Sequence, residues 1–186
     1  MQIITGKYKA RKLIHPDGQS TRPTLARIKE SIFSMLPLNF ENTVVLDLFA
    51  GSGAYGIEAI SRGAKRAFLV DNNHEAIKAI KLNSRGIDNV EIIEKDCFEA
   101  LNRFYEQHIK FNYVFLDPPY KSDIVGKVVS FIESHKLLED GGIIVYEHSI
   151  DKNLLPNLLK RYIIIKTRNY GTVSVDFIQN NSHQEI

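Results

Sequence analysis

The sequence is poor in cysteine, because Cys97 is the only one among 186 residues. A single cysteine excludes an intramolecular disulfide, and with six scattered histidines it predicts no structural zinc site and no other metal site. No apolar run approaches the roughly 20 residues that cross a membrane. The first residues, Met1 to Lys7, lack the basic and long apolar segments of a secretory signal peptide. We therefore expect a cytoplasmic protein with no membrane partner.

The chain also has little net charge, +2, but this charge is unevenly spread. Residues 1–30 carry seven lysines and arginines against two acidic residues, which is a local excess of +5. Such a segment is typical of a phosphate-binding surface. A solvated, lysine-rich terminus fits the same charge equally well. The content of 44% hydrophobic and 25% charged residues is ordinary for a globular protein, and the length predicts one domain.

The N-terminal segment predicts a β-hairpin followed by a helix. Residues 2–8 and 12–15 are the two expected strands, and Asp17-Gly18 is a turn signal. Thr24 is a suitable N-cap for a helix that runs to Leu36 with apolar residues at helical spacing.

The rest of the chain alternates short apolar runs with helical patterns. The expected strands are 44–46, 67–70, 90–93, 113–116 and 143–146, and the expected helices are 54–62, 73–84, 97–107, 123–135 and 152–160. Apolar strands that alternate with helices predict a parallel sheet covered on both faces.

The C-terminal part differs, because two β-rich runs, 162–167 and 173–178, flank the hairpin signal Asn169-Tyr170-Gly171. A mostly parallel sheet that ends in an antiparallel hairpin is the pattern of the Rossmann-like class I S-adenosylmethionine methyltransferase fold, an α/β fold. We expect residues 1–22 to form a basic hairpin arm of the same domain, residues 23–178 to form the methyltransferase domain, and residues 179–186 to form a disordered tail.

A glycine-rich segment follows the first strand of the sheet and contains G-x-G-x-x-G at Gly51, Gly53 and Gly56. Glycines there permit a tight turn and a close approach of backbone to a ligand. Asp71 ends the second strand, where a carboxylate accepts hydrogen bonds from ribose hydroxyls. The glycines and Asp71 alone fit a nicotinamide dinucleotide site nearly as well as an S-adenosylmethionine site.

Two further acids distinguish a dinucleotide site from an S-adenosylmethionine site. Asp47 precedes the glycines, where a carboxylate suits a ligand that carries an ammonium and a sulfonium and repels a pyrophosphate. Asp96 is expected at the end of the third strand, where it is placed to accept a hydrogen bond from an adenine amine. Either acid alone would equally suit a helix N-cap. As a trio with Asp71, the acids favour S-adenosylmethionine, with S-adenosylhomocysteine as the product. The candidate cofactor residues are Asp47, Phe49, Gly51, Gly53, Asp71, Asn72, Asp96 and Cys97.

The fourth strand ends in Asp117-Pro118-Pro119-Tyr120, the most specific motif of the chain. An exocyclic amine of a base is a poor nucleophile because its lone pair is delocalised into the ring. Asp117 and the Pro118 carbonyl are placed to accept its two hydrogens, the prolines hold that carbonyl rigidly, and Tyr120 is placed to stack on the base. These four residues are the predicted catalytic residues. The alternative is a stiff turn without a role in chemistry.

With these motifs the sequence resembles a known family, the bacterial 16S ribosomal RNA guanine-N(2) methyltransferases of the RsmD type. The resemblance covers residues 3–178. It rests on Ile3-Ile4, Gly6-Lys7-Tyr8, Arg11-Lys12-Leu13, Thr21-Arg22-Pro23-Thr24, Arg27, Glu30, Asp47 to Gly53, Ser61-Arg62-Gly63-Ala64, Asp117 to Tyr120 and Glu147-His148. One departure is Ala10, where a glycine is expected before the arginine, and another is Asn72-Asn73, where members often carry a charge.

The resemblance implies a ribosomal RNA substrate, free or within an assembled small subunit, with one guanine amine as the target. The protein is expected to act as a monomer. We expect the arm to bind RNA through Lys7, Arg11, Arg22 and Arg27. The role of His148 stays open between orienting Asp117, contacting substrate and simple packing.

Three alternative functions remain at this point. The first is a DNA or RNA adenine or cytosine amino methyltransferase, for which the chain shows no target-recognition domain. The second is an NAD-dependent oxidoreductase, which Asp47 disfavours. The third is a catalytically silent RNA-binding module, which the intact Asp117 motif disfavours.

Overall fold

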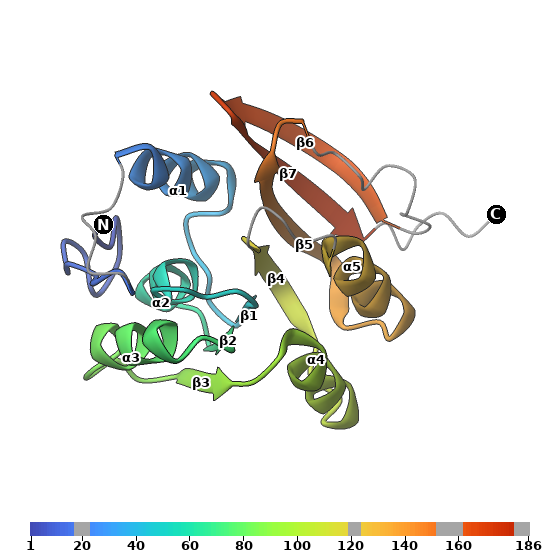
Figure 1. Cartoon of the computed structure of the whole chain (residues 1–186), viewed down its shortest axis with the longest axis horizontal. Coiled ribbons are helices and arrows are strands. Elements are labelled where there is room, and N and C mark those ends of the chain that lie inside the picture. Colours follow the sequence, from blue (N-terminus) through green and yellow to red (C-terminus); the bar gives the residue numbers. More distant parts are fainter. Residues whose placement is uncertain (17–22, 119–123, 152–161, 181–186) are drawn as a thin grey trace. The chain divides into compact units, whose positions relative to one another are not determined.

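The computed structural model describes residues 1–16, 23–118, 124–151 and 162–180 (Figure 1). These residues form two compact units, 1–96 and 97–186. Where the structure describes the chain, no helix is long and apolar enough to cross a membrane.

The first unit is a three-stranded parallel sheet with helices packed against it. Its elements are α1 (Pro23–Met35), β1 (Val44–Asp47), α2 (Ala54–Ser61), β2 (Arg66–Asp71), α3 (His74–Asn83) and β3 (Val90–Glu94). The strand order is β3-β2-β1, and both neighbouring pairs are parallel. Helix α2 packs on β1 and β2, and α3 packs on β2 and β3. The carboxyl ends of β1 and β2 therefore lie side by side at one edge, where Asp47 pairs with Leu69.

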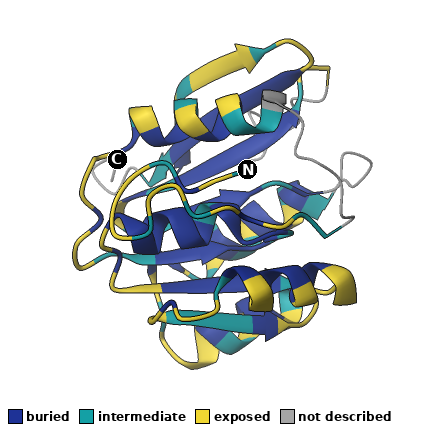
Figure 2. Ribbon diagram, turned by 90° about the vertical axis from the view of Figure 1, so that its left-hand side faces the viewer, coloured by how far each residue is buried: buried dark blue, intermediate teal, exposed yellow. Residues whose placement is uncertain are grey.

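Burial explains why these strands have nearly continuous apolar sequences. Ala67 to Val70 of β2 are all buried, whereas Glu75 and Lys78 of α3 are exposed; Figure 2 colours the ribbon by this burial. From α1 to β3 the predicted elements of this unit are confirmed, with one correction at α1. The helix begins at Pro23, so Thr24 lies in its first turn and does not precede it. Proline is favoured at that first position because its missing N–H has no intrahelical acceptor in any case.

The N-terminal hairpin exists but is shorter than predicted. Gln2 and Lys12 form an antiparallel bridge, and Ile3 exchanges backbone hydrogen bonds with Ala10 and Arg11. Residues 4–9 and 13–15 are not strand, contrary to the expected strands 2–8 and 12–15. The N–H groups of Ile4, Thr5, Lys7 and Tyr8 bond instead to Glu58 and Ser61 of α2. Ala10 adopts a φ of 66°, a left-handed conformation that glycine tolerates better. That conformation accounts for the glycine expected at this position.

The described residues of the second unit form a four-stranded mixed sheet and two helices. Its elements are α4 (Cys97–Glu106), β4 (Phe111–Leu116), α5 (Ile124–Ser134), β5 (Leu138–Ser149), β6 (Tyr162–Tyr170) and β7 (Val173–Asn180). The strand order is β4-β5-β7-β6, with β4 and β5 parallel and β7 antiparallel to both of its neighbours. The predicted mostly parallel sheet with a C-terminal antiparallel hairpin is confirmed. Strand β5 is longer than the predicted 143–146, and the predicted helix 152–160 lies outside the described residues.

Candidate functional site

The glycine loop of the first unit bridges the ends of β1 and β2. The chain leaves β1 after Asp47, and the N–H of Ala50 donates to the carbonyl of Val70 at 2.9 Å. The next N–H, that of Gly51, donates to the Asp71 carboxylate at 2.9 Å. Gly53 has a φ of 75° and directly precedes α2. The loop is therefore fixed to β2 by backbone and side-chain acceptors before any ligand binds.

The three glycines of the motif have different surroundings. A Cβ on Gly56 would lie 2.0 Å from a methyl group of Leu69, and one on Gly53 would lie 3.1 Å from the same side chain. These two glycines let α2 pack closely on β2. A Cβ on Gly51 would meet no atom within 4 Å. Gly51 is thus the glycine that faces open space, which a ligand approaching the loop requires.

Asp47 is a buried acid, with 2% of its surface exposed. Its Oδ2 accepts a hydrogen bond from the N–H of Gly56 at 3.0 Å, which ties β1 to the first turn of α2. Burial raises the pKa of Asp47 to about 7, and the charge of Asp71 adds to this effect. Hydrogen bonds from Gly56 and Tyr55 and the charge of Lys29 oppose it. A cation arriving beside Asp47 would favour its ionised form.

Asp71 uses both carboxylate oxygens to organise the loop. Oδ2 accepts from Gly51, and Oδ1 accepts from the N–H of Asn73 at 2.9 Å. Each carboxylate oxygen has two acceptor sites, so capacity for ligand hydroxyls remains. Asn73 then caps α3 by accepting from the N–H groups of Glu75 and Ala76. Sequence analysis missed this cap, although an asparagine directly before a helical pattern is the usual signal for one.

The other predicted cofactor residues differ in exposure and in the element that carries them. Asn72 is exposed, and Phe49 is half-buried. Strand β3 ends at Glu94, so the exposed Asp96 lies two residues beyond it and not at its end. Cys97, buried at the start of α4, belongs to the second unit.

The arm is held to the first unit by a buried carboxylate that sequence analysis did not single out. Glu58 of α2 is fully buried, and its two oxygens accept from the N–H groups of Ile4 (2.8 Å) and Thr5 (3.1 Å). The same carboxylate forms ion pairs with Lys29 at 3.1 Å and Arg62 at 3.0 Å. A single acid thus joins the arm, α1 and α2.

Further contacts fix the arm along α2. Ser61 accepts hydrogen bonds from the N–H groups of Lys7 and Tyr8, one through its carbonyl and one through its hydroxyl. A Cβ on Gly6, which has a φ of 91°, would lie 1.7 Å from the Ser61 carbonyl oxygen. Glycine is therefore required at this position for the arm to approach α2.

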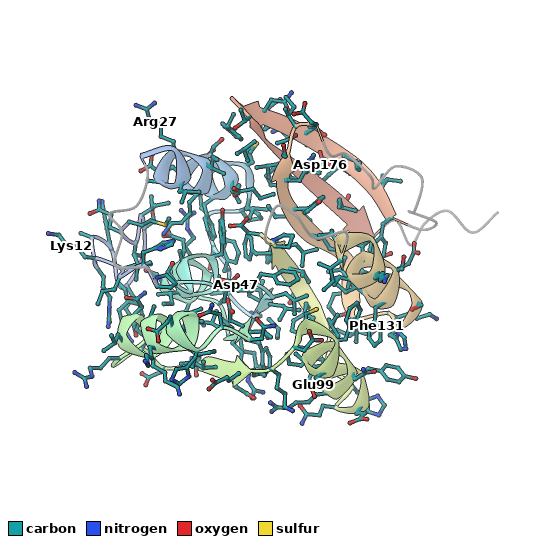
Figure 3. All side chains as sticks on the ribbon, viewed as in Figure 1. Lys12, Arg27, Asp47, Glu99, Phe131 and Asp176 are labelled. Atoms are coloured by element: carbon teal, nitrogen blue, oxygen red, sulfur yellow. The ribbon has the colours of Figure 1, made fainter. Side chains whose placement is uncertain are left out.

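The predicted RNA-binding residues fall into different environments. Lys7 and Arg27 are exposed, and Arg27 points away from the ribbon, as does Lys12 (Figure 3). Arg11 donates to the carbonyl of Arg85 at 2.6 Å, while Arg22 lies outside the described residues. The structure corrects one part of the charge argument. Lys29 is 1% exposed and paired with Glu58, so it is not available to a phosphate.

The Asp117 motif begins where β4 ends. Asp117 and Pro118 follow Leu116, whose partner in β5 is Tyr146, whereas Pro119 and Tyr120 lie outside the described residues. Strand β5 continues past this pair through Glu147 and His148. The predicted residues Asp117, Glu147 and His148 are therefore brought to the same edge of the second unit.

His148 is buried, and both of its ring nitrogens face acceptors. Nε2 lies 3.1 Å from Oδ2 of Asp176, and Nδ1 lies 2.8 Å from the carbonyl of Ser149. A carbonyl and a carboxylate both accept hydrogen bonds, so this arrangement favours the imidazole ring that carries a proton on each nitrogen. Burial alone would lower the pKa of His148, but the hydrogen bonds and the charges of Asp176 and Glu147 together raise it. Thr167 donates to the other Asp176 oxygen at 2.5 Å, so the network joins β5, β7 and β6.

Comparison with known proteins identifies the family. The family described as conserved hypothetical protein 95 matches residues 1–179. YlbH of Bacillus subtilis (strain 168), to which an rRNA methyltransferase activity is ascribed, is 36% identical over 178 residues, 94% of this chain and 96% of that protein. Ribosomal RNA small subunit methyltransferase D of Escherichia coli (strain K12) is 28% identical over 187 residues, 100% of this chain and 92% of that protein.

Solved structures agree with this result. The protein yhhF from Escherichia coli, to which methyltransferase activity is ascribed, has a TM-score of 0.82 and 26% identity, with 97% of each chain covered. The Thermus thermophilus 16S rRNA N2 G1207 methyltransferase, solved with AdoMet and guanosine, has a TM-score of 0.69 and 17% identity, with 87% of this chain and 44% of that one covered. That second likeness supports the fold alone. The resemblance drawn from the sequence is confirmed, and the chain belongs to the conserved hypothetical protein 95 family, the RsmD-type family of ribosomal RNA methyltransferases.

Proposed function

We propose that this chain transfers the methyl group of S-adenosylmethionine to the exocyclic amine of a guanine in 16S ribosomal RNA. The observation that carries the proposal is the carboxylate-lined glycine loop, on a chain that matches small subunit methyltransferases D over nearly its whole length. The same comparison disfavours an NAD-dependent oxidoreductase and a silent RNA-binding module. The reaction would take place in the cytoplasm, where small ribosomal subunits are made.

The described residues of the loop fit S-adenosylmethionine. Asp71 would accept the two ribose hydroxyls while it keeps its bonds to the loop backbone. Asp47 would face the cationic methionine end, and Asp96 would accept the adenine amine. The open space above Gly51 admits the ligand. A dinucleotide pyrophosphate would instead meet the carboxylates of Asp47 and Asp71. When bound, the cofactor supplies an electrophilic methyl group on a sulfonium.

The acceptor residues belong to the second unit. The Asp117 carboxylate and the Pro118 carbonyl would take the two amine hydrogens, which localises the nitrogen lone pair and orients it. Tyr120 would stack on the flat face of the base. We assign Asp117 to positioning first and to proton acceptance second.

RNA binding is assigned to the exposed cations of the arm and of α1. Lys7 and Arg27 are exposed, and the arm that carries Lys7 is rigidly attached. A base within a duplex does not reach such a loop, so the target guanine would lie in a loop or be flipped out.

The direct test is to map modified guanines in 16S ribosomal RNA from cells with and without this protein. The same RNA, naked and in small subunits, is then offered to the purified protein with labelled cofactor. We expect one N2-methylguanine to be lost in the cells and restored in vitro. Asp117→Ala should abolish transfer, and Asp117→Asn should retain part of it, because an amide oxygen still accepts a hydrogen bond. An unchanged guanine pattern, or methyl transfer to adenine or cytosine, would contradict the proposal.

The RNA-binding assignment has its own test. Replacing Lys7, Arg11 and Arg27 with alanine should weaken RNA binding and flatten its salt dependence by about one unit of log–log slope per lost phosphate contact. Cofactor affinity and thermal unfolding should stay unchanged. Lys81→Ala, an exposed cation on α3, is the control. An unchanged salt slope in the triple variant would show that the arm has only a structural role.

A further inference from the structure

Glu147 is a buried acid that has no assigned role in the proposed reaction. It lies near the end of β5, and only 3% of its surface is exposed. Burial of a carboxylate is unfavourable by several kcal/mol unless donors face it. Glu147 has contacts of its own within the fold. A carboxylate offers about four acceptor sites, so it can serve its neighbours and a ligand together.

Strand register places Glu147 beside Asp117. The last pair between β4 and β5 joins Leu116 to Tyr146, so the next residue of each strand is Asp117 and Glu147. A residue before proline is held in the extended region, which keeps Asp117 in line with β4. Neighbouring strands lie about 4.8 Å apart. The two carboxylates therefore start from adjacent backbone positions at the same edge.

Alternation places both acids on the same face of the sheet. Tyr146 and His148 share the other face, where their rings stack with centroids 4.7 Å apart. His148 is bound there to Asp176 of β7 and to the carbonyl of Ser149. Because side chains alternate along a strand, Glu147 must face the opposite side, which it shares with Asp117. The His148 network fixes this end of β5 and so fixes the direction of Glu147.

The three bases with an exocyclic amine differ in the ring atom beside that amine, and a second carboxylate can detect this difference. In guanine the 2-amino group is flanked by N1–H, a donor. In adenine the 6-amino group is flanked by N1, an acceptor, and in cytosine the 4-amino group is flanked by N3, also an acceptor. Guanine has an acceptor, N3, on the other side of the amine, so a carboxylate next to the amine-binding group attracts guanine when it faces N1–H. The same carboxylate repels adenine and cytosine when it faces their ring acceptor.

We propose that Glu147 selects guanine by accepting the N1–H of the target base, while Asp117 and the Pro118 carbonyl hold the 2-amino group. This inference rests on the proposed function, and it assigns the choice of guanine over the other bases to Glu147. Glu147 is a specificity residue that contacts the substrate beside the reacting amine.

The test uses 2-aminopurine, which keeps the 2-amino group of guanine but has an acceptor at N1. The substrate is 16S ribosomal RNA ligated with guanine or 2-aminopurine at the mapped position and supplied in the form that supports methylation. Wild type should prefer guanine by at least about 100-fold in kcat/KM, because a buried acceptor rejects a partner that lacks the donor. Glu147→Gln, whose amide donates to N1 of 2-aminopurine, should reduce this preference at least about tenfold.

The ratio of the two kcat/KM values is independent of the fraction of folded enzyme, so partial unfolding does not imitate the effect. Glu139→Gln, the same substitution at the opposite end of β5, should leave the ratio unchanged. Equal use of both bases by wild type would overturn the inference without any variant. Equal losses on both bases in Glu147→Gln would also overturn it. Failure of wild type to methylate guanine at all would overturn the proposed function and this inference with it.

Discussion

The buried carboxylate of Asp47 should make the stability of the protein depend on pH in a direction opposite to that of most acids. The perturbation is Asp47→Asn, which keeps an oxygen to accept the N–H of Gly56 but removes the titrating group. The folded pKa is raised from 3.8 to about 7. Between these values the native state holds a proton that the unfolded chain has released. Wild-type stability should therefore fall as pH rises from about 4 to about 7.

The magnitude follows from the difference between the two pKa values. At about 1.4 kcal/mol per pH unit, the rise from 3.8 to about 7 corresponds to about 4 kcal/mol. Asp47→Asn should match wild type near pH 4 and become more stable above pH 7, by up to about 4 kcal/mol. The assay is urea unfolding followed by circular dichroism at several pH values without cofactor. Under the proposed function the variant should also bind S-adenosylmethionine more weakly, by about 1.5–3 kcal/mol, because its charged acceptor is gone.

Asp88→Asn, a substitution at an exposed loop position of the same unit, is the control and should follow the wild-type pH profile. Parallel pH profiles for wild type and Asp47→Asn would refute the reasoning. A variant less stable than wild type at pH 8 would refute it as well.

Three other predictions concern residues outside the glycine loop. Glu58→Gln should destabilise the protein by about 3–5 kcal/mol in chemical unfolding, because two buried cations lose their partner, and a change below 1 kcal/mol would contradict the ion-pair geometry. Ala10→Gly should raise the free energy of unfolding by about 0.5–1 kcal/mol, because the φ of 66° suits glycine, and a destabilised variant would argue against that conformation. Asp176→Asn should lower the pKa of His148 measured by NMR. The loss of stability in Asp176→Asn should be greatest below pH 6.5 and should shrink as pH rises through the raised His148 pKa of the wild type. A loss of stability that does not depend on pH would contradict this prediction.

The fold was largely predictable from the sequence because its strands are short apolar runs bounded by clear breakers. Val44-Val45-Leu46 and Ala67 to Val70 have no other plausible place than the interior of a sheet. The arm was predicted less well. Its turn depends on Gly6 and on Ala10 with positive φ, and the alanine gives no sequence signal for that conformation. The N–H groups of Ile4, Thr5, Lys7 and Tyr8 have their acceptors on α2, and a local sequence pattern does not reveal these.

The candidate site was predicted from residues that lie close together in the sequence. The glycine loop and the Asp117 motif are local, so their residue types were informative. Glu58 and Lys29 pair across 29 positions, and His148 pairs with Asp176 across 28, so neither pair has a local signature. The one available hint was an acid within the otherwise apolar helix that starts at Ala54. Tertiary packing alone shows that Lys29 is internal and that both ring nitrogens of His148 face acceptors.

The attachment of the arm to Glu58 has a consequence for the thermodynamics of the proposed RNA binding. A flexible basic tail would lose conformational entropy when RNA orders it, at about 1–2 kcal/mol for each backbone residue fixed. Here the N–H groups of Ile4, Thr5, Lys7 and Tyr8 are already bound to α2. The ordering of this segment is completed when the first unit folds. Under the proposed function, an encounter with RNA would then immobilise only exposed side chains here, so residues 4–8 of the arm would act as a preorganised docking surface and not as a segment that folds on binding.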